Sequence, residues 1–174
     1  MERKLTLADI ACYLPYGLNF YSESVWDYPF PAIGFQKESI ITYRNRYDHE
    51  DGRFYLDIER YRLKPVLRLQ SDLYRTISHN GMEIVPIVEL AKVGTKLNNG
   101  WGLDSKYNNC ACNQRTGLLF GYDNEGFMTL PEQYQIYSQY RLFDYMNELK
   151  LDYPGLIDAK LAVSCYDLPE NPYK

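Results

Sequence analysis

Cysteine and histidine side chains are the first candidates for metal binding or catalysis, and the sequence has few of them: four cysteines and two histidines. The one closely spaced pair is Cys110-x-Cys112. A single intervening residue is tighter than the usual spacing in zinc sites, and no second Cys or His pair follows. A structural zinc is the alternative, but it would need Cys12 and Cys165 from opposite ends of the chain. We therefore predict two small thiols in a loop, no metal and no cofactor.

His49 and His79 each lie in or beside a turn signal, and neither has nearby residues that would complete an acid–base or metal site. We expect both to be solvated. Segments 48–52 and 123–126 faintly resemble calcium loops, but their acidic residues lack the full ligand spacing and suit hairpin turns. The common nucleotide-binding, hydrolase and metalloprotease motifs are absent from the sequence. We predict no catalytic residues. An enzyme remains an alternative that a buried cluster of Asp, His and Cys would support.

The segment from Gly94 to Gly117 is the predicted binding site. It is rich in Asn and Gly, and structureless loops of this length are uncommon in compact domains unless they are functional. It also contains Trp, Tyr and Arg, which are favoured at binding hot spots. The candidate binding residues are Trp101, Tyr107, Asn109 and Arg115. The alternative is a flexible insertion whose Trp packs on the core, because Trp is usually highly buried.

A second candidate surface lies between Tyr43 and Arg68, where basic and aromatic residues alternate. That composition is typical of surfaces that bind single-stranded nucleic acid. The same span carries seven basic and five acidic residues, so ion pairs across a solvated strand face explain it more simply. Nucleic-acid binding is therefore the alternative function. The residues it would use are Tyr43, Arg44, Arg46, Tyr55, Arg60 and Arg62.

Length and composition limit these options further. The 174 residues suit one globular domain, 1–174, in which we expect 168–174 to be a loosely held tail. The net charge of −4 argues against broad phosphate binding, while the 18 tyrosines favour interfaces. The start of the chain has no apolar leader, and no apolar run is long enough to span a membrane. We expect a cytoplasmic protein with reduced thiols and no membrane partner.

The expected fold class is α+β, with a small, mainly antiparallel sheet and four or five short helices packed on it. A central stretch, 63–93, contains an extended lead-in, a short helix ended by Asn80-Gly81, and a second helix that starts at Pro86 and stops at Gly94. The remaining elements follow from capping residues and hydrophobic periodicity. They are a helix from Thr6 to Leu14, strands at 39–43 and 54–58, a hairpin at 118–130, and helices at 131–149 and 156–162.

Five blocks of the sequence have a recurring general form: 5–18, 63–73, 84–92, 124–128 and 156–162. Together they resemble an uncharacterised family of short proteins carried by prophages and mobile elements of gut bacteria. The resemblance covers about half of the chain. The family often has Pro after the Arg of the Lys-Pro block, whereas Leu69 follows Arg68 here. The resemblance implies a phage-related bacterial cytoplasm and assigns no functional residue.

The absence of a catalytic motif and the excess of Tyr lead to one functional hypothesis. We predict a non-enzymatic, phage-related interaction protein that binds a host or phage protein. Self-association is a related possibility, because exposed aromatic patches often mark interfaces.

Overall fold

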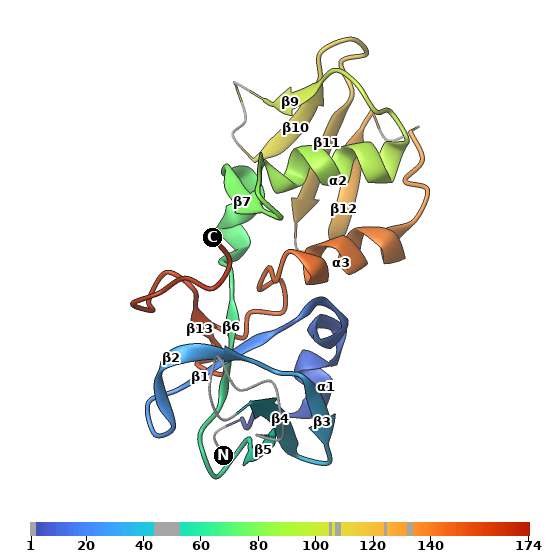
Figure 1. Cartoon of the computed structure of the whole chain (residues 1–174). Helices are drawn as coiled ribbons and strands as arrows, with labels where there is room; N and C mark the ends of the chain where they lie inside the picture. Colours follow the sequence, from blue (N-terminus) through green and yellow to red (C-terminus); the bar gives the residue numbers. More distant parts are fainter. Residues whose placement is uncertain (1–2, 44–52, 105, 107–108, 124, 132–133) are drawn as a thin grey trace. The chain divides into compact units, whose positions relative to one another are not determined.

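The computed structural model describes residues 3–43, 53–104, 106, 109–123, 125–131 and 134–174 (Figure 1). Its contacts divide the chain into two compact units, which are described one at a time. Unit 1 consists of residues 1–69 and 147–174, and unit 2 of residues 70–146. Unit 1 is therefore discontinuous in sequence, because the chain leaves it to form unit 2 and then returns.

Strands dominate the secondary structure, so the expectation of a small sheet covered by four or five helices is wrong. The described residues form 13 strands in four sheets, with three α-helices and two short 3-10 helices. The physical reason is local. A hairpin largely replaces the first helix expected in the central stretch, because periodicity over so few residues cannot separate a helix from a strand. Two further strands, Trp101–Leu103 and Cys110–Asn113, lie in the segment 94–117, which was expected as a loop.

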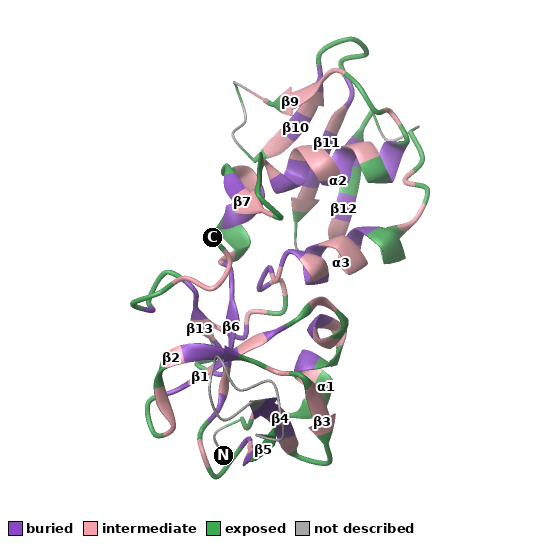
Figure 2. Ribbon diagram, in the orientation of Figure 1, coloured by how far each residue is buried: buried purple, intermediate pink, exposed green. Residues whose placement is uncertain are grey.

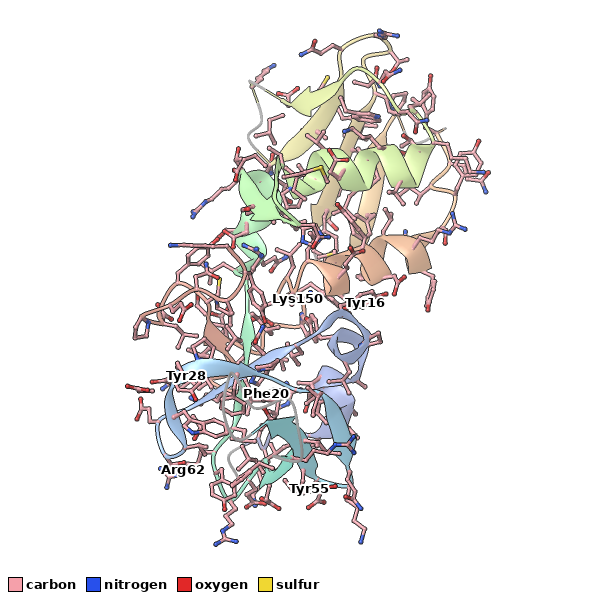
Figure 3. All side chains as sticks on the ribbon, viewed as in Figure 1. Tyr16, Phe20, Tyr28, Tyr55, Arg62 and Lys150 are labelled. Atoms are coloured by element: carbon pink, nitrogen blue, oxygen red, sulfur yellow. The ribbon has the colours of Figure 1, made fainter. Side chains whose placement is uncertain are left out.

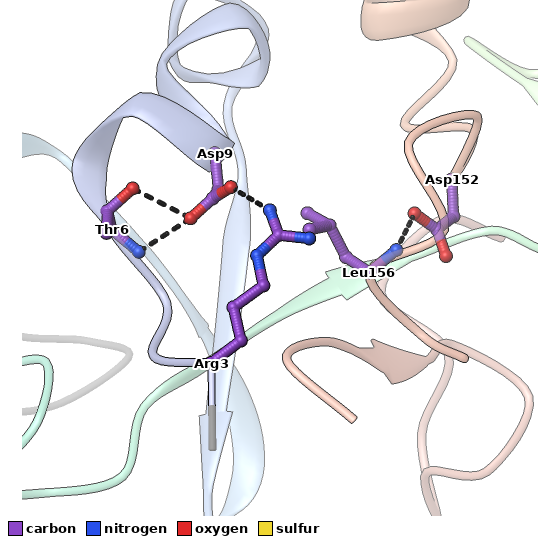
Figure 4. Close-up of polar contacts among 5 residues, drawn as sticks. All are labelled: Arg3, Thr6, Asp9, Asp152 and Leu156. Carbon is purple, nitrogen blue, oxygen red and sulfur yellow. Dashed lines mark hydrogen bonds and ion pairs between the residues drawn. The ribbon is translucent and has the colours of Figure 1, made fainter. Parts of the chain in front are cut away.

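Unit 1 begins with α1 (Leu7–Ile10), which continues directly into the 3-10 helix η1 (Ala11–Tyr16). The Asp9 carboxylate accepts hydrogen bonds from the Thr6 backbone N–H at 2.8 Å and from the Thr6 hydroxyl at 2.7 Å, and it also pairs with Arg3 (Figure 4). Burial acts to raise the pKa of Asp9, but these bonds hold it below its ordinary value. The capping box predicted at Thr6 and Asp9 is confirmed.

One sheet of unit 1 has four strands in the order β13-β6-β1-β2. Strand β1 pairs antiparallel with β2 and β6, and β13 pairs parallel with β6. The bounds are β1 (Asn19–Ser22), β2 (Trp26–Pro31), β6 (Lys64–Leu67) and β13 (Val163–Ser164). Strand β6 thus joins the N-terminal part of the unit to the segment that returns from unit 2.

The other sheet of unit 1 is the antiparallel set β3-β4-β5. Its strands are β3 (Gly34–Gln36), β4 (Ser39–Tyr43) and β5 (Arg53–Asp57), in agreement with the strands expected at 39–43 and 54–58. Ile40 pairs with Leu56, and both are buried in a core with Tyr13, Phe20 and Leu67.

The returning segment is held to the end of β6 by main-chain bonds. The Arg68 N–H donates to the Lys150 carbonyl at 2.8 Å, and the Asp152 N–H donates to the Arg68 carbonyl at 2.9 Å. The buried Asp152 carboxylate then accepts a bond from the Leu156 N–H at 2.7 Å (Figure 4). It also accepts one from the Ile157 N–H at 2.7 Å. Burial raises the pKa of Asp152 even though these bonds act in the opposite direction. The helix expected at 156–162 is replaced by turns, which this carboxylate organises.

Residues 168–174, expected as a loosely held tail, make specific contacts with β6 and β1. The Tyr173 hydroxyl donates to the Val66 carbonyl at 2.6 Å and accepts from the Asn19 N–H at 3.4 Å. The buried Arg68 guanidinium donates to the Tyr173 carbonyl and lies 5.4 Å from the centre of the Tyr173 ring. Tyr173 therefore supplies an apolar ring, a hydrogen-bond donor and a hydrogen-bond acceptor where the C-terminal segment meets β6 and β1.

Unit 2 contains an antiparallel sheet in the order β12-β11-β10-β9. The strands are β9 (Trp101–Leu103), β10 (Cys110–Asn113), β11 (Leu119–Asp123) and β12 (Gly126–Leu130), so the hairpin expected at 118–130 is confirmed. Buried residues alternate with partly or fully exposed ones along β10 and β12 (Figure 2). Helices α2 (Pro86–Thr95) and α3 (Gln139–Glu148) pack on the buried face. A Cβ on Gly94 would lie 2.9 Å from the Phe120 ring and 3.3 Å from Leu142, so only glycine fits there.

Three local expectations in unit 2 are corrected. Asn80 and Gly81 have φ angles of 51° and 75° and close a hairpin between β7 (Ile77–His79) and β8 (Met82–Ile84), where a helix end was expected. The first helix of the central stretch is reduced to the 3-10 turn η2 (Gln70–Tyr74). The helix expected from residue 131 begins only at Gln139.

The contacts of Tyr173 generate the first prediction. Replacing Tyr173 with Phe should lower the free energy of unfolding by about 1–2 kcal/mol near pH 8, because the Val66 carbonyl loses its donor. Burial raises the pKa of Tyr173 above its ordinary value of 10.0, so the folded state keeps this proton while the unfolded state releases it. This stabilisation is complete below pH 10 and is lost as the pH rises through the raised pKa.

The measurement is urea unfolding at a series of pH values from 8 to 11. The stability difference between wild type and Tyr173→Phe should narrow above pH 10, because Phe cannot ionise. The control is Tyr55→Phe, an exposed tyrosine of β5 in the same unit, which should change stability by no more than about 0.5 kcal/mol. If the two substitutions change the free energy of unfolding equally, the contacts of Tyr173 contribute nothing to stability.

Candidate binding surface

Trp101, the strongest candidate of the predicted loop, forms a hydrogen bond and a ring contact within unit 2. Its indole N–H donates to the Leu97 carbonyl at 2.7 Å, and its ring packs edge-on against Phe120 at 6.4 Å between centres. Half-buried at the start of β9, it matches the alternative in which the Trp packs on the core. The segment 94–117 is not a structureless loop, because it contains the end of α2 and the strands β9 and β10.

The other predicted binding residues do not form one patch with Trp101. Asn109 is exposed and borders a shallow cavity on the opposite face of the sheet, whereas Arg115 is exposed in the turn between β10 and β11. Tyr107 lies outside the described residues. Trp101 is therefore structural and Asn109 lies on the other face of the sheet, whereas the Arg115 side chain passes beside Gly100, the residue before Trp101.

Asn113 is the residue that shapes this region, and the sequence analysis did not single it out. It is buried at the end of β10. Its side-chain N–H donates to the Asn99 carbonyl at 3.0 Å, while its side-chain oxygen accepts from the N–H groups of Arg115 at 3.1 Å and Thr116 at 3.2 Å. A single amide thus joins the end of β10 to the segment before β9.

The basic and aromatic span of unit 1 contributes few described residues to a nucleic-acid surface. Arg44 and Arg46 lie outside the described residues, as does the side chain of Tyr43. Tyr55 and Arg62 are both exposed but lie apart on the unit (Figure 3). Arg60 lies over the Tyr61 ring, 5.3 Å from its centre, and its backbone N–H donates to the Asp57 carboxylate at 2.6 Å. Acidic side chains are therefore interspersed with the basic ones.

Within the described residues, no three His, Cys, Asp or Glu side chains come close enough together to hold a metal ion. His79 shares a 3.0 Å hydrogen bond with the Asn80 side chain beside the β7–β8 turn, and His49 lies outside the described part. None of the described helices is both long enough and apolar enough to cross a membrane.

Among the described residues of unit 2, the most exposed aromatic side chains are three tyrosines just before and at the start of α3, here called the tyrosine stripe. They are Tyr134, Tyr137 and Tyr140, with exposed fractions of 41%, 57% and 77%. Their spacing of three residues was assigned to the interior of a long helix, and α3 in fact starts only at Gln139.

Hydrogen bonds hold the stripe to the body of unit 2. The Tyr137 N–H donates to the Gly94 carbonyl at 3.0 Å, and the Thr129 hydroxyl donates to the Tyr134 carbonyl at 2.7 Å. The Gln139 side chain donates to the Phe127 carbonyl at 3.4 Å. The main chain is therefore fixed at both ends of the stripe while the three rings face solvent.

Two basic residues adjoin the stripe. The Lys96 ammonium at the end of α2 lies 3.8 Å from the centre of the Tyr137 ring, a cation–π contact. Arg141 follows Tyr140 and is exposed. Val93, an exposed apolar residue with a 42% accessible side chain, lies three residues before Lys96 on the same helix. The result is a surface of tyrosines beside positive charge.

Comparison of the chain with protein-family models, with curated proteins and with solved structures finds no match. The resemblance to prophage proteins stays an expectation from short sequence blocks.

The role of Asn113 generates a prediction with a built-in control. Asn113→Asp places a buried carboxylate against the Asn99 carbonyl, in place of a donor, and should cost about 2–4 kcal/mol of stability near pH 7. Asn109→Asp makes the same change at an exposed position and should cost no more than about 0.5 kcal/mol.

The measurement is thermal unfolding of both variants from pH 7 to pH 4. Burial should raise the pKa of the new carboxyl, and its protonated form can again donate to Asn99, so Asn113→Asp should regain stability as the pH falls. If both variants lose the same stability at pH 7, Asn113 does not organise this region.

Proposed function

We propose that the chain is a non-enzymatic interaction protein that binds a host or phage protein through the tyrosine stripe. The observation that supports this most directly is the presentation of Tyr134, Tyr137 and Tyr140 to solvent from a segment whose main chain is fixed by hydrogen bonds. The proposal places the protein in a phage-related bacterial cytoplasm, as the sequence resemblance implies.

Tyrosine suits this role for physical reasons. Its ring buries a large apolar area while only two side-chain torsions are immobilised, and its hydroxyl can form a hydrogen bond at a wet boundary. Because the main chain of the stripe is already ordered, binding needs to order only side chains. Two of the rings, Tyr137 and Tyr140, are more than half exposed and supply the apolar area for the contact.

The charges beside the stripe narrow the chemistry of the partner. Lys96 and Arg141 are exposed next to Tyr137 and Tyr140, and the net charge of the whole chain is −4. A partner segment with carboxylates around an apolar centre complements this local charge. We therefore propose an acidic protein surface as the partner. Self-association is the related alternative, in which a second copy provides that surface.

Nucleic-acid binding is the second candidate function, because tyrosines beside Lys and Arg can also stack single-stranded bases. The span first considered, residues 43–68, brings acidic side chains among its basic ones. A gel shift with single-stranded and double-stranded DNA and RNA at low salt separates the two ideas. Binding that weakens steeply with salt would favour nucleic acid.

A matched pair of variants tests the protein-binding proposal. Tyr137→Ala/Tyr140→Ala removes the two most exposed rings of the stripe, and Tyr55→Ala removes a tyrosine of unit 1 that is about as exposed as Tyr137. Each protein is immobilised, and partners from a bacterial host lysate are quantified by mass spectrometry. Proteins enriched on wild type should be reduced at least about tenfold on the stripe variant, equivalent to a loss of about 1.4 kcal/mol of binding free energy. The same proteins should be retained on Tyr55→Ala.

Three outcomes would contradict the proposal: no protein enriched on wild type, the same proteins on the stripe variant, or equal losses on both variants. Circular dichroism melts show whether the variants are folded, and exposed substitutions should shift stability by no more than about 0.5 kcal/mol. Light scattering at high concentration tests self-association. A wild-type monomer would exclude a second copy as the partner.

A further inference from the structure

The face of the unit 2 sheet that points away from α2 has a shallow cavity, and Gly121 of β11 forms part of its lining. Strand pairing places Gly121 between Cys110 of β10 and Met128 of β12. Residues two apart on a strand point to the same face, so Leu119, Gly121 and Asp123 follow one another along the cavity. Its volume of about 450 Å³ lies within the range of sites that bind small molecules.

The missing side chain at Gly121 makes part of this cavity a narrow slot. A Cβ atom at this position would lie 3.8 Å from the Cys110 Cβ and 3.7 Å from the Met128 Cγ. Both distances are ordinary van der Waals contacts, so one file of carbon atoms would touch both walls. A second file beside it would overlap one of the walls. The slot therefore suits an unbranched hydrocarbon chain.

The two ends of the slot differ in chemistry. At one end Leu119 pairs with Leu130, which is exposed, so apolar side chains line the cavity there. At the other end lies Asp123, the only charged residue among the described residues that line the cavity. Its carboxylate accepts a bond from the Glu125 N–H at 2.8 Å. Because a carboxylate has about four acceptor positions, it can accept further bonds from a ligand.

A second carboxylate adds negative charge to this face of the sheet. The Asp104 N–H donates to the Cys110 carbonyl at 3.1 Å, and the preceding residue, Leu103, pairs with Ala111. Asp104 therefore lies beside Cys110 on the face that carries the cavity. Its carboxylate accepts a bond from the main-chain N–H of Lys106 at 2.7 Å. The potential of the two carboxylates favours a cationic group on the ligand.

We propose that the slot binds a small, free aliphatic amine, whose hydrocarbon chain lies over Gly121 and whose ammonium group pairs with Asp123. Apolar walls with one carboxylate at the end complement both parts of such a ligand. The strand spans roughly 13 Å from Leu119 to Asp123, and a carbon chain advances about 1.2 Å per bond, so about eight to ten carbon atoms fill the slot. This site is independent of the tyrosine stripe, because it uses different residues and a different ligand.

The first test is calorimetric titration of the unmodified chain, near neutral pH, with octylamine, octanol and octanoate. These probes share one chain length and differ in the charge of the head group. Octylamine should bind with a stoichiometry of one per chain. Octanol should bind at least about tenfold more weakly because it lacks the charged donor for Asp123, and octanoate should bind more weakly still. Asp123→Asn should abolish the preference for octylamine over octanol.

A matched pair of glycine variants tests where the chain lies. Gly121→Ala places a methyl group in the slot at ordinary contact distances from its walls, so the fold is kept while the space for the ligand is lost. Octylamine should bind this variant at least about tenfold more weakly. Gly102→Ala adds the same methyl group beside Cys112 on β9, where the nearest atom is 3.6 Å away. Gly102 is outside the lining of the cavity, so this control should bind octylamine as wild type does.

Methionine methyl signals in nuclear magnetic resonance spectra give a second readout on the unmodified chain. Of the four methionines, Met128 borders the slot, Met146 is buried and Met82 is exposed. With isotopic labelling of the methyl groups, octylamine should shift the Met128 signal and leave those of Met82 and Met146 unchanged. The variant Met128→Leu identifies the signal.

The proposal is overturned if octylamine does not bind, if Gly121→Ala binds it as wild type does, if octanoate binds as tightly, or if the Met82 signal shifts together with that of Met128. It is also overturned if the Met128 signal moves with protein concentration when no amine is present, because a second copy then covers this face. Nα-acetyl-lysinamide represents a lysine of a partner protein and is too short to fill the slot. If it binds as tightly as octylamine, the slot takes a protein side chain and the proposal of a free amine is wrong.

Discussion

The pairing of β6 with the returning C-terminal segment is the constraint on which unit 1 depends. Val66 and Leu67 pair with Val163 and Ser164, and the main chain of Arg68 bonds to Lys150 and Asp152. These residues are separated in sequence by the whole of unit 2, so the pairing must close a long loop before it contributes any energy. Loop-closure entropy grows only slowly with loop length, and several buried contacts at one joint offset it. Tyr173 and Arg68 add side-chain bonds at the same place.

Unit 2 depends on a different constraint, the close approach of α2 to its sheet. Gly94 lets the helix backbone contact the Phe120 ring, and Phe120 in turn packs against Trp101 and Phe127. The neighbouring residue on β11, Gly121, points to the other face and opens the gap between Cys110 and Met128. Alternation along a strand therefore gives one face a packed aromatic core and the other an open row of sulfur and glycine. Phe120 belongs to the packed face of the sheet, and the adjacent Gly121 belongs to the open face.

Local features of the fold could be predicted from the sequence, and long-range ones could not. The capping box of Thr6 and Asp9 and the hairpin at 118–130 depend on residues close in sequence, and both are present. Asn80-Gly81 was recognised as a left-handed turn, but that conformation ends helices and closes hairpins equally well, so its partners decided the outcome. The pairing of β13 with β6 has no signature in either short strand. The helix predicted from Pro131 begins only at Gln139, because the residues before it carry no apolar stripe and Tyr134 accepts a bond from the Thr129 hydroxyl instead.

For the candidate sites too, residue types could be read from the sequence, whereas their contacts with residues far along the chain could not. Trp101 was chosen for its residue type, but residue type does not reveal that its N–H is already bonded to Leu97 and its ring to Phe120. Cys110 and Cys112 were not predicted to bind zinc, because one intervening residue is tighter than the usual zinc spacing and no second Cys or His pair follows. Strand pairing sets both thiols on one face and brings Met128 opposite Cys110 across a glycine. A strand fixes the direction of both side chains, because residues i and i+2 lie on one face of the sheet. The chemistry available to a residue pair is thus decided by the secondary structure that carries it.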